Sequence, residues 1–140
     1  MLLLSVQTIR VDSEGAGYFG ASRSGHVHEG VDLEANSGQP IYAPFNGTIT
    51  RTAAPYKPSA GPKSALGGFV FTGSEYQFKI FYAKALSVGS YFSEGDIIGY
   101  ADNVQQYYSP AMKNHIHVEL RDKAGTLLDP TKFLTNLKKK

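Results

Sequence analysis

Residues 114–120, NHIHVEL, alternate polar and apolar side chains in the way of a β-strand. Successive side chains of a strand point to opposite faces, so His115 and His117 lie side by side on one face and can point at a single position. A metal ion is the simplest occupant of such a position. The strand therefore predicts one half of a metal site on the face of a β-sheet.

The other two histidines lie in a second short stretch, HVHEGVD, residues 26–32. His28 and Asp32 are four positions apart, which a straight strand would separate by about 13 Å. A bend at Gly30 would instead let both side chains converge. Either stretch alone is also compatible with solvated or hydrogen-bonded histidines. Because the rest of the chain holds no histidine, we interpret the two stretches as halves of one site.

The ligand types favour zinc. Two imidazoles and one carboxylate, with water in the fourth position, form the open tetrahedral arrangement typical of catalytic zinc. Mixed nitrogen and oxygen ligands also suit manganese and nickel. The spacing does not decide which of the four histidines bind the metal.

The rest of the chain is patterned as short strands joined by turns. The composition is 41% hydrophobic and 19% charged, with 15 Gly and 7 Pro among 140 residues, which is typical of a globular protein rich in turns. We predict an all-β fold, an antiparallel β-sandwich or barrel-like core, in a single domain over residues 1–140. Strands are expected within residues 5–11, 39–52, 69–86, 93–102 and 114–122.

Three connecting segments have their own signals. Residues 39–52 contain a hairpin-like corner at Pro44 and Asn46-Gly47, and residues 69–86 form a hairpin around positions 73–75. Residues 54–68 have no periodicity and predict a long exposed loop beside the site. Residues 129–139 begin with Asp-Pro, which predicts one short C-terminal helix.

Composition also argues against several classes of protein. The formal charge of +2 and a single basic run at residues 138–140 do not favour a nucleic-acid partner. The absence of cysteine excludes a disulfide framework and a thiolate metal site. No stretch approaches the length of a membrane span, and MLLLS at the start of the chain falls short of a signal peptide. These patterns carry no signal about the oligomeric state.

The two histidine stretches also carry a resemblance to a known family. HEGVD and HIHVEL are similar to the His-x-x-x-Asp and His-x-His motifs of the lysostaphin-type zinc endopeptidases. The resemblance continues through IYAPFNGTIT, FYAKALSVGSYFSEGDIIG and LLDPTKFL, and covers most of residues 25–134. It implies a barrel-sandwich β core with a groove, zinc bound by His28, Asp32 and His117, and His115 as general base.

The family cuts peptide cross-links of bacterial cell walls. The resemblance therefore implies a peptidoglycan peptide, or another peptide ligand, in the groove. It also implies action outside the cytoplasm, by secretion, in the periplasm, or by delivery to the cell wall within a larger assembly. Groove loops such as residues 54–68 are expected to set the specificity.

One position departs from the family pattern. Active members carry a further histidine in a Tyr-x-His-Leu-Ser stretch, where it stabilises the oxyanion, and YAKALS places Lys84 there. A lysine can still stabilise negative charge. Loss of a group that stabilises the oxyanion nevertheless lowers rates by roughly 10²–10³. We expect a zinc endopeptidase that is weak or inactive.

Residues 100–120 resemble leukocyte cell-derived chemotaxin 2, a secreted animal relative that holds zinc and has lysine at the position of Lys84. This resemblance implies an alternative function as a non-catalytic, zinc-stabilised binding or signalling module. His26 is expected to be a solvated surface residue, with a substrate contact or a residue that supports the metal ligands as the alternatives. Glu29 and Glu119 are placed beside ligands, and neither is assigned as base while His115 is available.

Overall fold

The computed structural model describes residues 1–23 and 26–138, apart from the side chains of Arg23 and His26. Within these residues the chain is mostly antiparallel β-sheet, with two short 3₁₀ helices. No helix in this part of the chain has the length and hydropathy needed to cross a membrane. The predicted all-β class is confirmed.

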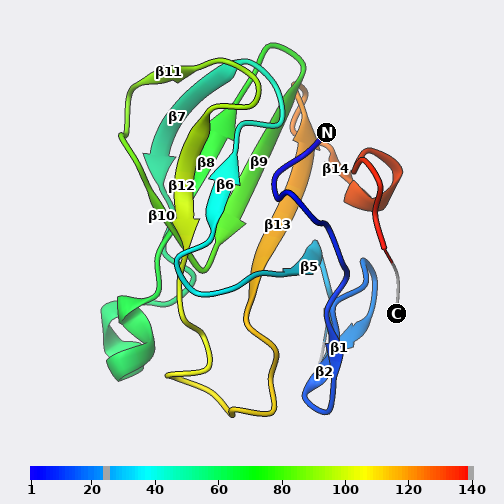
Figure 1. The fold of residues 1–140 in the computed structure, drawn as a ribbon, viewed down its shortest axis with the longest axis vertical. Helices are drawn as coiled ribbons and strands as arrows, with labels where there is room; N and C mark the ends of the chain where they lie inside the picture. Colours follow the sequence, from blue (N-terminus) through cyan, green and yellow to red (C-terminus); the bar gives the residue numbers. More distant parts are fainter. Residues whose placement is uncertain (24–25, 139–140) are drawn as a thin grey trace.

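The largest sheet is built around one long strand, β13 (Figure 1). This strand, His115–Asp122, pairs along one side with β9, Tyr76–Phe81, and along the other with β5, Val31–Glu34. The sheet has the order β11-β7-β8-β9-β13-β14, with β5 also on β13. The remaining strands are β7 (Gly47–Thr52), β8 (Gly68–Thr72), β11 (Tyr91–Phe92) and β14 (Leu127–Leu128).

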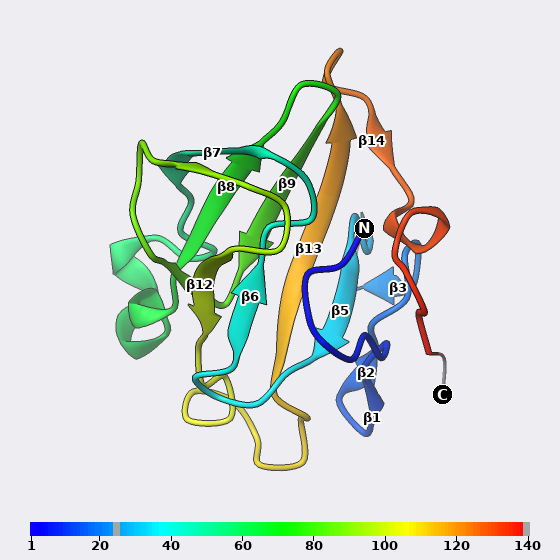
Figure 2. The same cartoon turned by 45° about the horizontal axis from the view of Figure 1, so that its top comes forward.

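A smaller sheet lies over one face of the larger one (Figures 1 and 2). It has the order β10-β12-β6, from strands Ala83–Ala85, Ile97–Ala101 and Pro40–Tyr42. At Gly99 a Cβ atom would lie 3.1 Å from the Phe69 ring of the larger sheet, so the sheets are in close contact there. Fully buried side chains between the sheets include Phe69, Phe71, Phe78, Ile41, Ile80 and Ile98.

Alternation along β13 places the site on the opposite face from this core. Ile116, Val118 and Leu120 have no exposed surface and belong to the hydrophobic core. Their neighbours His115, His117 and Glu119 therefore point to the other face of the sheet. All three are also buried. The strand predicted from NHIHVEL is confirmed, together with the alternation that defines its two faces.

Two small hairpins border the site near the N-terminus. They join β1 (Val11–Asp12) to β2 (Gly15–Ala16) and β3 (Ser22–Arg23) to β4 (His26–Val27). Backbone hydrogen bonds attach this segment to β5: Arg10 N donates to Asp32 O at 2.8 Å, and Asp32 N donates to Gly17 O at 2.9 Å. The glycine-rich lead-in therefore covers the edge of β5 beside Asp32.

The predicted strand at residues 5–11 is wrong in its extent. Thr8 and Ile9 form only isolated bridges, to Lys138 and to Leu33, and regular pairing begins at Val11. Because Thr8 and Ile9 pair with different segments, no continuous ladder forms. The Gln7 side chain also accepts a hydrogen bond from Leu3 N at 2.9 Å, which turns the chain before this region.

The hairpin predicted around residues 73–75 is confirmed by the pairing of β8 with β9. The corner in residues 39–52 is not a hairpin, because β6 pairs with β12 in the small sheet and β7 pairs with β8 and β11 in the large one. Pro44 lacks an N–H and cannot continue the ladder, so the chain changes sheets at this point.

The two helix-related expectations are met only in part. The segment 54–68 is mostly exposed and contains a 3₁₀ helix, η1 (Pro58–Ala65). No residue of η1 is buried, whereas Leu66 after it is buried. The C-terminal helix is limited to one 3₁₀ turn, η2 (Pro130–Lys132), capped by the Asp129 side chain on Thr131 N. It ends there because the following residues bond to the N-terminal segment, as in Thr135 N to Met1 O at 2.8 Å.

Candidate metal centre

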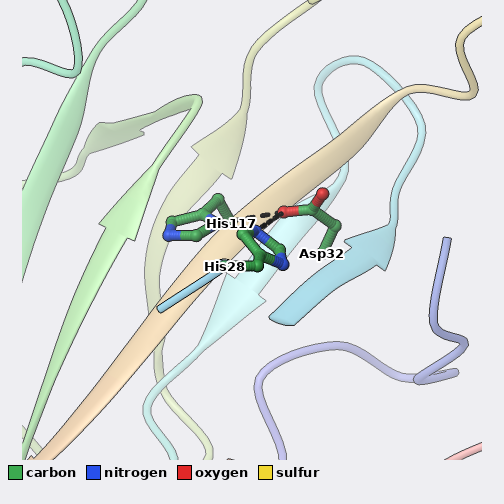
Figure 3. A group of neighbouring side chains, drawn as sticks. All are labelled: His28, Asp32 and His117. Atoms are coloured by element: carbon green, nitrogen blue, oxygen red, sulfur yellow. Dashed lines mark hydrogen bonds and ion pairs between the residues drawn. The ribbon is translucent and has the colours of Figure 1, made fainter. Parts of the chain in front are cut away.

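Three buried side chains point toward one another on the outer face of β13 (Figure 3). His28 Nε2 and His117 Nδ1 lie 3.0 Å apart, and Asp32 Oδ1 lies 3.0 Å from His117 Nδ1 and 3.3 Å from His28 Nε2. Ligands about 2.0–2.1 Å from a tetrahedral zinc ion are separated by about 3.3 Å. The three donor atoms therefore fit a zinc ion.

Strand register explains how Asp32 and His117 come together. Asp32 of β5 is the direct cross-strand partner of His117 on β13. Side chains of such a pair lie on the same face, with Cβ atoms about 4.5–5.5 Å apart. On the other side of His117, its partner on β9 is Phe81, whose ring stacks on the imidazole with centroids 5.7 Å apart. The imidazole is thus held between two neighbouring strands.

Gly30 brings His28 to the same position. The chain bends at Gly30, as the sequence predicts. A Cβ atom there would collide with Val118 O and would lie 2.9 Å from the His117 ring. Only glycine allows the segment to cross β13 this closely. The bend lets His28 reach the donors of Asp32 and His117 from the loop that precedes β5 (Figure 3).

A second hydrogen bond orients each of the two histidines in the cluster. His28 Nδ1 donates to Tyr18 O at 3.0 Å, and His117 Nε2 donates to Glu119 Oε2 at 2.8 Å. A carbonyl or carboxylate oxygen can only accept, so these bonds assign the protons to the ring nitrogens that face away from the centre. The remaining nitrogens, His28 Nε2 and His117 Nδ1, are left as ligands.

A buried arginine holds the aspartate. Arg10 is 3% exposed, and its Nη2 lies 3.1 Å from Asp32 Oδ2 while its Nη1 lies 2.8 Å from Asp12 Oδ1. Arg10 thereby occupies one carboxylate oxygen of Asp32 and leaves Oδ1 for the metal. Arg10 carries no signal of this role in the sequence, because it lies in an alternating stretch and its partner Asp32 is 22 positions away.

The charges of the cluster favour a bound cation. Burial alone would raise the pKa of Asp32, but its contacts with the imidazoles of His117 and His28 lower the pKa well below its usual range. Burial opposes protonation of His117, but its hydrogen bonds to Asp32 and Glu119 raise its pKa to about 9. The carboxylates of Asp32 and Glu119 therefore favour a positive charge at His117. A metal ion bound at Nδ1 would supply that charge.

His115 lies beside the three donors and is arranged differently. Its Nδ1 donates to Lys113 O at 2.9 Å, so its Nε2 carries the free lone pair. Nε2 is 3.9 Å from Asp32 Oδ2. Burial lowers the pKa of His115, which keeps the imidazole neutral near pH 7. A neutral imidazole with a free Nε2 next to the ligands can accept a proton.

The cluster opens into a cavity of about 500 Å³. Aromatic side chains from several segments form much of the wall, and Lys63 lies 4.2 Å from the centre of the Tyr108 ring. Glu14 and Glu29 are exposed at its rim. Besides the three clustered residues and His115, the lining includes Arg10, Pro55, Tyr56, Phe81, Tyr82, Tyr108 and Met112.

Lys84 lies apart from the described lining of this cavity. Its Nζ donates to Ala65 O at 2.8 Å and lies 3.0 Å from Asp102 Oδ1. Its side chain is 58% exposed. The structure therefore brings His28, Asp32, His115 and His117 together and places Lys84 in a separate ion pair. The side chain of His26 lies outside the described part, so its role stays a prediction.

Comparison with known proteins identifies the family. The profile of peptidase family M23 matches residues 26–130. The chain belongs to peptidase family M23. It is 34% identical over 124 residues to leukocyte cell-derived chemotaxin-2 of Bos taurus, which covers 88% of this chain and 76% of that protein. The same identity and coverage hold for the Mus musculus protein. The resemblance to chemotaxin-2 thus extends well beyond the second histidine motif.

Solved structures show the same fold. The structure of LytU has a TM-score of 0.62 at 24% identity, covering 83% of this chain and 80% of that chain. Lysostaphin from Staphylococcus simulans, an antimicrobial peptidase, has a TM-score of 0.59 at 21% identity, covering 89% and 49%. The predicted resemblance to the lysostaphin-type family is confirmed.

Proposed function

We propose that this chain is a zinc-dependent endopeptidase that cuts peptide cross-links of bacterial peptidoglycan. The observation that carries the proposal is the set of three donors 3.0–3.3 Å apart, with the free Nε2 of His115 beside them in an open cavity. Membership of peptidase family M23 supports peptide hydrolysis as the reaction class. A cell-wall substrate would place the protein outside the cytoplasm.

In this proposal His28, Asp32 and His117 hold the zinc ion. When bound, zinc supplies Lewis acidity that polarises a carbonyl oxygen and makes water a stronger acid. Arg10 keeps Asp32 ionised and oriented through its 3.1 Å contact with Oδ2. Glu119 and the Tyr18 carbonyl keep the two imidazoles in the tautomers that binding requires.

His115 acts as the general base. Its Nε2 takes a proton from the attacking water, and the carbonyl of Lys113 at 2.9 Å from Nδ1 stabilises the imidazolium that results. The same nitrogen then returns the proton to the departing amine. We expect slow turnover, because the described lining of the cavity holds no histidine beyond His28, His115 and His117.

A digestion of purified sacculi tests the proposal. Zinc-loaded protein is expected to release soluble muropeptides, and treatment with a chelator should stop the release until zinc is restored. New amino termini, measured by labelling, distinguish peptide cleavage from glycan cleavage. Failure of zinc-loaded protein to release any peptide product over a day would reject the enzymatic function.

A second candidate is a non-catalytic, zinc-stabilised module that binds a peptide ligand in the same cavity. Two observations favour it: the ion pair that holds Lys84 away from the cavity, and the 34% identity to leukocyte cell-derived chemotaxin-2. This alternative predicts that zinc removal lowers the melting temperature while hydrolysis stays undetectable with zinc bound. The sacculus digestion and a thermal melt with and without zinc therefore separate the two candidates.

A further inference from the structure

Tyr82 has an unusual backbone conformation beside the metal cavity. Its φ of 65° lies in the left-handed region, which a bulky side chain rarely adopts. Such a conformation persists only where surrounding bonds hold it. At Tyr82 it turns the ring into the cavity, where the ring meets His115 edge-on with centroids 5.2 Å apart.

Two backbone hydrogen bonds hold Tyr82 from opposite sides. Its N–H donates to Gly67 O at 2.8 Å, and its carbonyl accepts from Asp102 N at 2.7 Å. Gly67 lies between η1 and β8, and Asp102 directly follows β12. The conformation of Tyr82 therefore depends on the relative positions of these two segments.

Lys84 and Asp102 join the same two segments through their side chains. Lys84 Nζ lies 3.0 and 3.2 Å from the two carboxylate oxygens of Asp102 and donates to Ala65 O at 2.8 Å. Asp102 Oδ2 also accepts from Gly67 N at 2.8 Å. At Gly67 a Cβ atom would lie only 2.7 Å from Ala83 O, so the junction leaves no room for a side chain.

We propose that Lys84 and Asp102 form a brace that holds Tyr82, and that the Tyr82 hydroxyl donates a hydrogen bond to a ligand oxygen in the metal cavity. Lys84 is then a positioning residue that acts through Tyr82. The proposal rests on the zinc site of the proposed function and does not depend on hydrolysis.

The chemistry of the phenol suits this role. Burial raises the pKa of Tyr82, and the charge of Tyr56 and a hydrogen bond with its hydroxyl raise the pKa further, so the Tyr82 hydroxyl keeps its proton. A neutral phenol aimed at a developing or bound negative oxygen is an effective donor where water is excluded. Tyr82 and Tyr56 both line the cavity that contains His115 and the metal-binding residues.

The exposure of Lys84 separates this role from a general contribution to stability. An ion pair with one partner 58% exposed contributes little to the folding equilibrium. Loss of the brace is therefore expected to shift the melting temperature by no more than about 3 °C. The expected effect lies in the orientation of Tyr82 and hence in ligand affinity.

Calorimetric titration of the zinc-loaded full chain with acetohydroxamate tests the proposal, because this probe presents an anionic oxygen to the metal cavity. Tyr82→Phe should weaken binding about tenfold, the effect of one hydrogen bond to a charged group. Lys84→Met should weaken acetohydroxamate binding about threefold to tenfold, whereas Lys84→Arg should keep most of the wild-type affinity. Lys123→Met, which removes a remote pair with Glu75, serves as the matched control and should leave affinity unchanged.

A double-mutant cycle isolates the action of Lys84 through Tyr82. In the Tyr82→Phe background, Lys84→Met should cause no further loss of acetohydroxamate affinity. Hydrogen exchange at the amides of Gly67 and Tyr82 should be faster in Lys84→Met and in Asp102→Asn, at unchanged zinc content.

Three results would overturn the brace: an equal loss from Lys84→Met in both backgrounds, no loss from either single substitution, or no acetohydroxamate binding by the zinc-loaded wild type. Hydrolysis of sacculi is measured separately. Absent hydrolysis with intact probe binding would reject the enzymatic function and leave the brace standing.

Discussion

The two sides of the metal cavity are built from different kinds of structure. On one side, Asp32 and His117 are cross-strand partners on β5 and β13, buried and fixed by sheet register. On the other side, Tyr82 and Tyr56 are placed by turns, an exposed 3₁₀ segment and an ion pair at Lys84. The metal-holding side is therefore specified by the sheet, and the ligand-facing side by loops that can change without disturbing the metal.

The largest expected effect concerns His115, which shares β13 with His117 but does not belong to the cluster of three donors. His115→Gln should lower the rate of sacculus hydrolysis by about 10²–10⁴, because the base is lost. Zinc content, measured by mass spectrometry of the metal, should stay at one ion per chain. A parallel loss of zinc would move His115 into the metal-binding set.

Removal of a ligand from the sheet side should release the metal. Zinc sites bind with about 10–16 kcal/mol shared among four ligands, so His117→Ala should lower zinc affinity on the order of a hundredfold to a thousandfold. Competition with a chromophoric chelator measures this affinity. His26→Ala is the control among the four histidines and should leave it unchanged. An equal loss from both substitutions would contradict the assignment of ligands.

Loss of the Glu119 carboxylate, which accepts a hydrogen bond from His117 Nε2, should have a smaller effect on zinc affinity. Burial opposes ionisation of Glu119, but the hydrogen bond from His117 and the charges of His117 and Lys79 lower its pKa to about 2, so it is ionised near pH 7. Glu119→Gln should lower zinc affinity about tenfold to a hundredfold. Arg121→Met tests whether the effect passes through Arg121, another partner of Glu119 at 3.2 Å, and should change zinc affinity by less than threefold.

The smallest expected effect concerns the loop side. Lys84→His places the residue type of active relatives at this position but removes the partner of Asp102 at 3.0 Å. Because the brace is lost, hydrolysis should fall by about threefold rather than rise. Rates on sacculi at matched zinc content check this. A tenfold gain would show that only the histidine was missing and would contradict the brace.

The sheet side could be predicted from sequence because its signals are local. Alternation in residues 114–120 identified the face of β13 that carries His115 and His117. The spacing of His28 and Asp32 around a glycine predicted a bend, and the structure has one at Gly30. Both signals, the alternation of the strand and the position of the glycine, involve residues that are close together in the sequence, so a single sequence shows them.

The remaining features depend on contacts between distant segments. Arg10 pairs with Asp32, 22 positions along the chain. Lys84 pairs with Asp102, 18 positions along the chain. No local pattern marks such partners. In an alternating stretch of sequence, a charged side chain that is buried in an ion pair looks the same as one that is solvated. The left-handed conformation of Tyr82 has the same origin, since its stabilising bonds come from Gly67 and Asp102.

Anomalous diffraction at the zinc absorption edge, from crystals of the full chain grown with equimolar zinc, tests the assignment of the metal centre most directly. We predict one peak per chain, about 2.0–2.2 Å from each of His28 Nε2, Asp32 Oδ1 and His117 Nδ1. A peak on any other group of side chains, or no peak at these three atoms, would contradict the account.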